Sequence, residues 1–116
     1  MYLLVLLFVK HWVVDFVAQT EEEIKYKGVF GDWRGIKHSL KHGALTAVIA
    51  FMVVDPVFAL LVGLTDFVVH YLVDWTKMNY GERDMKNPKF WRDLGLDQLA
   101  HALTYVFIFN LLLEHV

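Results

Sequence analysis

Histidine and aspartate recur at a spacing of four residues in four separate stretches of the chain. Imidazole nitrogens and carboxylate oxygens are common ligands of divalent transition metals, and histidine also carries protons near neutral pH. Because the chain has no cysteine, a metal site would use only nitrogen and oxygen donors. The candidate metal ligands are His11 and Asp15; His38 and His42; Asp66, His70 and Asp74; and Asp97 and His101.

The number of candidate donors bears on the kind of site. A single zinc ion takes four ligands, and a catalytic zinc keeps one position for water. Nine donors therefore favour two ions, or one ion with supporting residues around it. We expect a divalent transition metal, zinc first, with manganese and iron as alternatives. Two other interpretations remain open at this point: a proton or ion relay, and structural hydrogen bonds between helices worth about 0.6 kcal/mol each.

The elements that must position these donors are strongly apolar. The chain is 57% hydrophobic with a mean hydropathy of +0.41, too apolar for an ordinary soluble domain of 116 residues. The apolar tract over 36–79 is too long for one span, since about 20 residues cross ~30 Å of hydrocarbon. Asp55 and Pro56 suit the start of a new helix. We predict one all-α domain over 1–116, an integral membrane four-helix bundle with helices near 1–19, 36–54, 56–79 and 94–115.

Charge sets the expected orientation of this bundle. Lysine and arginine gather in the connections over 20–35 and 80–93, whereas the Asp55-Pro56 turn carries neither. The positive-inside rule then places both connections in the cytoplasm and both termini on the opposite side. A step of four residues keeps each His/Asp set on one stripe of its helix. At ~1.5 Å per residue most of the nine lie roughly 5 to 12 Å from the cytoplasmic ends, with His38 shallower and Asp66 deeper. The sequence therefore predicts a polar cluster in the cytoplasmic half.

Several other features carry alternatives. Lys10 either extends toward an interface or neutralises Asp15. Lys77 is either an interface anchor or a cation at the mouth of the site. The segment EEEIKYKGVF, residues 21–30, is expected to be a solvated connector rather than a short surface helix. The first apolar segment lacks a basic start, which favours a retained helix over a signal peptide. The net charge of −2 argues against nucleic acid as a partner.

The spaced combination of HWVVDFVAQ, HSLKH, DFVVHYLVDWTK and DQLAH resembles a family of small membrane proteins of bacteria and phages, domain of unknown function 3307 (DUF3307). The resemblance covers nearly the whole chain. It implies a bacterial or phage source and the bacterial inner membrane, and it implies no activity. The chain is also loosely similar to bacterial membrane-bound metal-dependent hydrolases, which place His and Asp on several transmembrane helices; that likeness implies hydrolysis only by analogy.

The leading functional hypothesis is a metal-dependent hydrolase that acts on a lipid head group or another phosphoester reaching the site from the cytoplasmic leaflet. A metal-bound water with a pKa of ~7 would attack, and a carboxylate that is not a ligand would take its proton. Which carboxylate does so is not readable from the sequence. The alternative is a non-enzymatic membrane protein. It would either relay or transport protons or divalent ions, or serve as a small scaffold subunit of a larger complex. The expected surroundings are the lipid bilayer, with a homo-oligomer possible.

Overall fold

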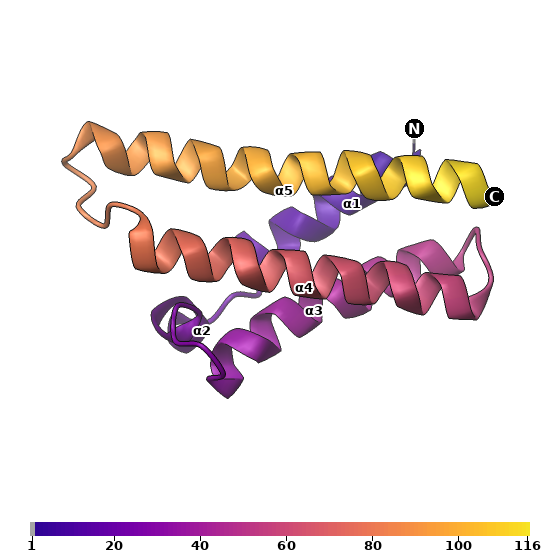
Figure 1. Cartoon of the computed structure of the whole chain (residues 1–116), viewed down its shortest axis with the longest axis horizontal. Helices are drawn as coiled ribbons and strands as arrows, with labels where there is room; N and C mark the ends of the chain where they lie inside the picture. Colours follow the sequence, from indigo (N-terminus) through magenta and orange to yellow (C-terminus); the bar gives the residue numbers. More distant parts are fainter. Residues whose placement is uncertain (1) are drawn as a thin grey trace.

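The computed structural model describes residues 2–116, and this part of the chain is helical and contains no strand (Figure 1). Four long segments carry most of the residues, and a short helix lies between the first two. The elements in chain order are α1 (Tyr2–Trp12), a π-helical turn η1 (Val13–Val17), α2 (Glu21–Tyr26), α3 (Trp33–Phe51), α4 (Pro56–Tyr80) and α5 (Pro88–His115).

Side-chain caps fix where the helices begin. The carboxylate of Asp55 accepts a hydrogen bond from the Phe58 backbone N–H, and Pro56 occupies the first helical position. This confirms the predicted division between the second and third long helices. Asn87 and Pro88 repeat the arrangement at the start of α5, six residues before the predicted start at 94. The hydropathy pattern missed this extension because its first turns are polar.

The first helix departs most from the prediction of a continuous α-helix over 1–19. Its α-helical part ends at Trp12, and η1 follows as one wider turn, closed by a 2.7 Å bond from the Ala18 N–H to the Val13 carbonyl. Such π turns insert one residue into the helical repeat and occur often at functional sites. Here the turn carries Asp15.

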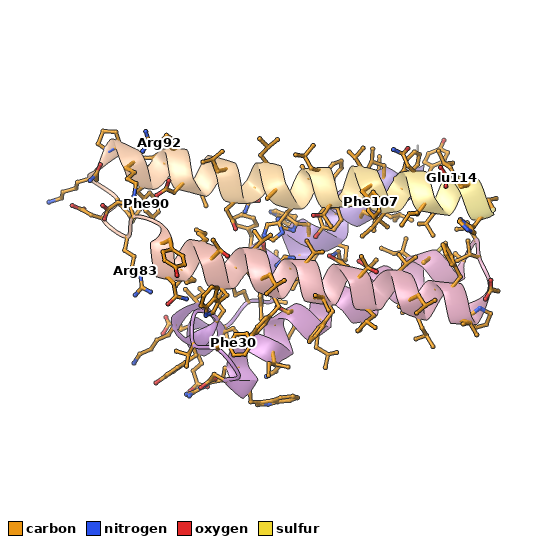
Figure 2. The ribbon with its side chains drawn as sticks, in the orientation of Figure 1. Phe30, Arg83, Phe90, Arg92, Phe107 and Glu114 are labelled. Carbon is orange, nitrogen blue, oxygen red and sulfur yellow. The ribbon has the colours of Figure 1, made fainter. Side chains whose placement is uncertain are left out.

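The four long segments form a closed ring in which α1 contacts α3 and α5, and α4 contacts the same two helices. The α2 segment and the α4–α5 loop lie at one end of the elongated molecule, and both termini and the α3–α4 turn lie at the other (Figure 1). Arg83 and Arg92 mark the loop end, whereas Phe107 lies toward the end with the termini (Figure 2). This is the relative placement of loops and termini that the sequence predicts.

The interior divides along the length of the ring. Toward the termini it is an apolar core, and toward the loops it is filled by the histidines and aspartates. Among the described helices, α4 and α5 are long and apolar enough to cross a membrane. The core residues are Leu7, Ala50, Ala59, Val62, Tyr105, Ile108 and Leu112.

Candidate metal centre

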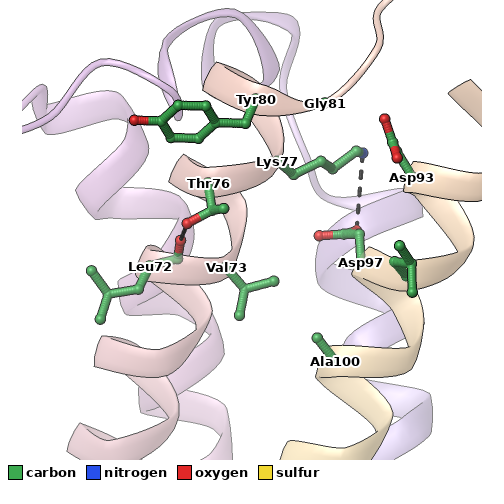
Figure 3. A pocket seen from close by; sticks show the side chains of 10 residues that line it. Leu72, Val73, Thr76, Lys77, Tyr80, Gly81, Asp93, Asp97 and Ala100 are labelled. Carbon is green, nitrogen blue, oxygen red and sulfur yellow. Dashed lines mark hydrogen bonds and ion pairs between the residues drawn. The ribbon is translucent and has the colours of Figure 1, made fainter. Parts of the chain in front are cut away.

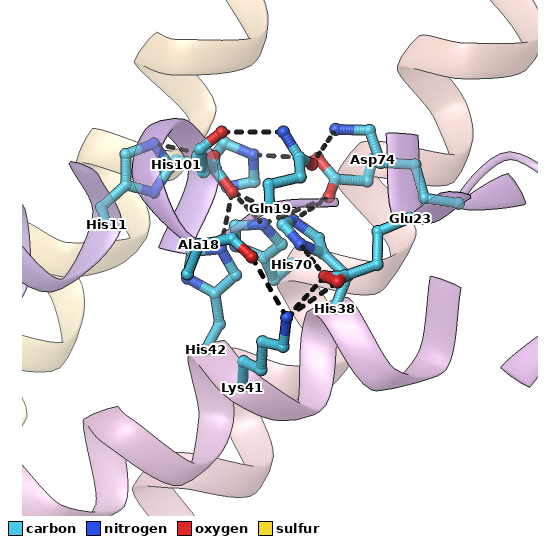
Figure 4. Close-up of polar contacts among 12 residues, drawn as sticks. His11, Ala18, Gln19, Glu23, His38, Lys41, His42, His70, Asp74 and His101 are labelled. Carbon is cyan, nitrogen blue, oxygen red and sulfur yellow. Dashed lines mark hydrogen bonds and ion pairs between the residues drawn. The ribbon is translucent and has the colours of Figure 1, made fainter. Parts of the chain in front are cut away.

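The His/Asp stripes of the four long segments meet inside the ring (Figure 4). The residues His38, His42, His70, Asp74 and His101 are each at most 2% exposed. Asp15 enters from η1, His38 and His42 from α3, His70 and Asp74 from α4, and His101 from α5. Residues that are up to 86 positions apart in the sequence therefore share one buried polar cluster.

One group of donors surrounds the Asp15 carboxylate. Its Oδ1 lies 2.8 Å from His42 Nε2, 3.0 Å from His38 Nε2 and 3.8 Å from His70 Nε2. One donor atom from each of these four residues lies within 4.8 Å of the other three. The wider π-helical turn brings Asp15 into this position at the point where α1 reaches the cluster.

A second group surrounds the Asp74 carboxylate. Its Oδ2 lies 3.2 Å from His70 Nε2 and 3.4 Å from His38 Nε2, and its Oδ1 lies 3.4 Å from His101 Nε2. His70 therefore belongs to both groups. Its ring stacks on His42 on one side and on His101 on the other, at centroid distances of 3.5 and 4.0 Å.

Many of these buried atoms face one another without forming hydrogen bonds. Buried polar groups are nearly always satisfied in folded proteins, so such a concentration requires an explanation. Two ligands on a tetrahedral zinc with bonds of ~2.0–2.1 Å lie about 3.3 Å apart, close to the separations described above. A cation between the donors would satisfy them. The atoms without a hydrogen-bond partner are both ring nitrogens of His38 and of His70, Asp74 Oδ2, Asp97 Oδ1 and His101 Nε2.

The remaining candidates lie at the edge of the cluster or apart from it. His11 Nε2 is 3.2 Å from Asp15 Oδ2, and Asp97 Oδ1 is 3.3 Å from His101 Nε2. Asp66 is separate, because its Oδ2 accepts hydrogen bonds from Thr46 and from the Lys10 ammonium at 2.9 Å. The membrane depth predicted from the sequence also places Asp66 deeper than the other candidates.

Lys10 follows neither of the alternatives drawn from the sequence. Its side chain is buried and it pairs with Asp66, 56 positions away, rather than with Asp15 or an interface. Its Nζ also contacts His42 Nδ1 at 3.0 Å and the Tyr105 hydroxyl at 2.9 Å. Tyr105 was not among the candidates, because a tyrosine in an apolar stretch gives no signal of its own.

The segment expected to be a solvated connector contains α2, and that expectation was wrong. Thr20 caps this helix by accepting a bond from the Glu23 N–H, a Thr-x-x-Glu pattern that could have indicated it. The Glu23 carboxylate is buried against Lys41 at 2.7 Å and lies 3.4 Å from His38 Nδ1. Burial acts to raise the pKa of Glu23, but the hydrogen bonds and charge of Lys41 outweigh it and hold that pKa below its usual value. The Glu23 carboxylate thus lies next to the outer nitrogen of His38, one of the candidate ligands.

A pocket of about 420 Å³ opens between α4 and α5 near the loop end (Figure 3). Its walls are mainly apolar, with Leu72 and Val73 on α4 and Leu96 on α5. Asp97 lines it, and the Lys77 ammonium lies 3.9 Å from the Asp97 carboxylate. Through Asp97 the pocket reaches the edge of the His/Asp cluster.

Residues 3–116 match the family described as "Protein of unknown function (DUF3307)". No curated protein and no solved structure matches the chain significantly. The looser likeness to membrane-bound hydrolases therefore gains no support from these comparisons.

Proposed function

The chain belongs to the DUF3307 family of proteins of unknown function, and we propose that it is a membrane metalloprotein that hydrolyses a phosphoester, such as a lipid head group, at its His/Asp cluster. The observation that carries the proposal is the set of buried donors that face one another without hydrogen bonds. Nitrogen and oxygen donors of this kind suit zinc first and also manganese or iron.

Charge balance supports a divalent cation. Lys10 and Asp66 neutralise each other at 2.9 Å, which leaves the Asp15 and Asp74 carboxylates surrounded by histidine side chains. Buried charge without compensation is costly, and one divalent ion would balance these two carboxylates. Because His70 is common to both donor groups and one ring nitrogen binds one ion, the arrangement favours a single ion. A second ion would require the carboxylates to bridge.

The apolar outer surface supports placement in a bilayer as a four-helix bundle. Large side chains on the outside of α4 and α5, such as Leu60, Leu64, Leu103 and Phe107, are more than half exposed. In the proposed orientation the loop end, with α2 and the α4–α5 connection, faces the cytoplasm of a bacterium. The metal centre then lies in the cytoplasmic half of the inner membrane.

The pocket between α4 and α5 supports hydrolysis of an amphipathic substrate. Its apolar walls would hold a lipid chain, and Lys77 offers a positive charge near the phosphate. Metal ions lower the pKa of a bound water to ~7 and so supply a nucleophile. Asp97 lines the pocket and keeps one carboxylate oxygen unpartnered 3.3 Å from His101, so it is placed to accept the proton of that water.

A relay through the membrane is the weaker alternative. Protons or ions would need polar groups along the whole ring, but the described interior beyond Tyr105 is formed by Leu7, Ala50, Ile108 and Leu112. The imidazole stack of His42, His70 and His101 therefore leads to a closed apolar end.

The test is elemental analysis of protein purified in mild detergent, without chelator and without a histidine tag. We expect about one equivalent of a transition metal per chain, with loss of that metal in His38→Gln and His70→Gln. His115→Gln is the matched control, because His115 lies exposed at the end of α5. Folded wild-type protein that stays metal-free after incubation with zinc, manganese and iron would refute the site. A metal-loaded protein that cleaves no phospholipid or model phosphoester would refute the hydrolase.

A further inference from the structure

The Lys10 ammonium lies between three acceptors on three different helices. It is 2.9 Å from Asp66 Oδ2 on α4, 3.0 Å from His42 Nδ1 on α3 and 2.9 Å from the Tyr105 hydroxyl on α5. An ammonium has three N–H donors and no acceptor. The three contacts therefore use each donor once, and the Asp66 carboxylate provides the opposite charge.

This direction of donation determines which nitrogen of His42 carries a proton. Because Lys10 donates to Nδ1, that nitrogen must offer its lone pair, and a neutral ring then carries its hydrogen on Nε2. His42 Nε2 lies 2.8 Å from Asp15 Oδ1 and donates to it. An Nε2 that carries hydrogen has no lone pair for a metal.

The same ammonium determines the state of His11 through Tyr105. The phenol oxygen accepts from Lys10, so its O–H is free to donate to His11 Nδ1 at 2.9 Å. The hydrogen of His11 then lies on Nε2, which faces Gln98 Oε1 at 3.0 Å and Asp15 Oδ2 at 3.2 Å. Asp15 Oδ1 thus receives an N–H from His42 and Gln98 Oε1 receives one from His11, and Lys10 orients both histidines.

We propose that Lys10 is a positioning residue that keeps His42 as an N–H donor to Asp15 and His11 as an N–H donor to Gln98, so that the metal is bound by His38, His70, Asp15 and Asp74. The ligand assignment rests on the proposed metal site, whereas the proton positions do not. His38 Nε2 lies 3.0 Å from Asp15 Oδ1 and 3.4 Å from Asp74 Oδ2. His70 Nε2 lies 3.8 Å and 3.2 Å from the same two oxygens. Both of their Nε2 atoms lack a hydrogen-bond partner, as does that of His101, whereas the Nε2 atoms of His42 and His11 each have one.

This division explains why the cluster holds more donors than an ion requires. Outer groups that hydrogen-bond a ligand fix its orientation and tune its basicity. Asp15 would be held from outside by the hydrogen bond from His42, with the His11 ring 3.2 Å from its other oxygen, and the Glu23 carboxylate lies 3.4 Å from the outer nitrogen of His38. The inner set of two imidazoles and two carboxylates fills a tetrahedral zinc, so a bound water would require the higher coordination number that manganese and iron also accept.

The first experiment measures proton positions by ¹⁵N NMR of histidine-labelled, metal-free protein in detergent micelles. His11→Gln and His42→Gln assign the two signals. We expect both rings to carry hydrogen on Nε2. Tyr105→Phe should allow the hydrogen of His11 to move to Nδ1 and leave the hydrogen of His42 on Nε2. The double variant Lys10→Met, Asp66→Leu replaces the buried pair by apolar groups and should allow the hydrogen to move in both rings. Wild-type His42 with its hydrogen on Nδ1 would overturn the proposal, because Lys10 would then be an uncharged acceptor.

The second experiment measures zinc binding by equilibrium dialysis. We expect His42→Gln and His11→Gln to keep one equivalent with a Kd weakened about 10- to 100-fold, as for groups that support a ligand. Loss of stoichiometric metal from folded His42→Gln, with binding intact in the wild type, would overturn the ligand assignment alone. A wild-type chain that binds no metal would overturn the proposed function and the ligand assignment together, while the NMR result would still decide the role of Lys10.

Discussion

Helices α3 and α4 approach each other closely beside the proposed metal centre. Gly43 on α3 packs against Gly63 on α4, one residue after His42 in the chain and three residues before Asp66. A Cβ added at Gly43 would lie 2.7 Å from the Gly63 carbonyl oxygen and 2.8 Å from the Cβ of Phe67. Neither neighbour is the flexible end of a side chain, so Gly43→Ala must move α3 away from α4.

The size of that movement follows from the contact. Restoring an ordinary separation of 3.4 Å requires about 0.7 Å, and overpacking of this kind costs roughly 1–3 kcal/mol. The same two helices carry His38 and Asp74, whose facing atoms are 3.4 Å apart. Metal bonds tolerate about ±0.2 Å, so the displacement exceeds what the site can absorb. We therefore expect Gly43→Ala to lose stability and metal together.

Unfolding in detergent followed by circular dichroism, with metal content measured on the same samples, tests this expectation. Gly95→Ala is the matched control, because Gly95 is exposed on α5 with no atom within 4 Å of an added Cβ. The control should keep its metal and gain about 0.5–1 kcal/mol from helix propensity. Full stability and full metal content in Gly43→Ala would show that α3 and α4 do not meet as described.

Three further outcomes are expected. Lys10→Met should destabilise the protein by about 3–5 kcal/mol in the same unfolding assay, because it leaves the Asp66 carboxylate buried without its cation. The double variant Lys10→Met, Asp66→Leu should recover most of this loss. Equal stability of the two variants would contradict the pairing. Lys41→Met should raise amide hydrogen exchange in α2, because the Glu23–Lys41 contact at 2.7 Å holds that helix; unchanged exchange would show that other contacts suffice. Asp97→Asn should keep the metal and lose phosphoester hydrolysis, whereas full activity would remove Asp97 as the proton acceptor.

The family and the helical character of the chain could be predicted from the sequence alone. The resemblance to DUF3307 is confirmed by the match over residues 3–116. The Asp55-Pro56 boundary was found because a cap and a proline act within a few residues of where they stand. The short helix α2 was missed although its Thr20 and Glu23 signal is equally local.

The spacing of four residues determined that each helix has a polar stripe, because helical periodicity is a property of the local backbone. It could not determine which stripes face one another or which groups pair. Lys10 meets Asp66 and Tyr105 across 56 and 95 positions, and the π turn at Asp15 appears only where α1 reaches its partners. Such contacts depend on how whole helices pack, and periodicity within one helix carries no information about its neighbours. The sequence by itself therefore defined a set of possible donors, and the tertiary structure decided which of them converge and which of them Lys10 directs.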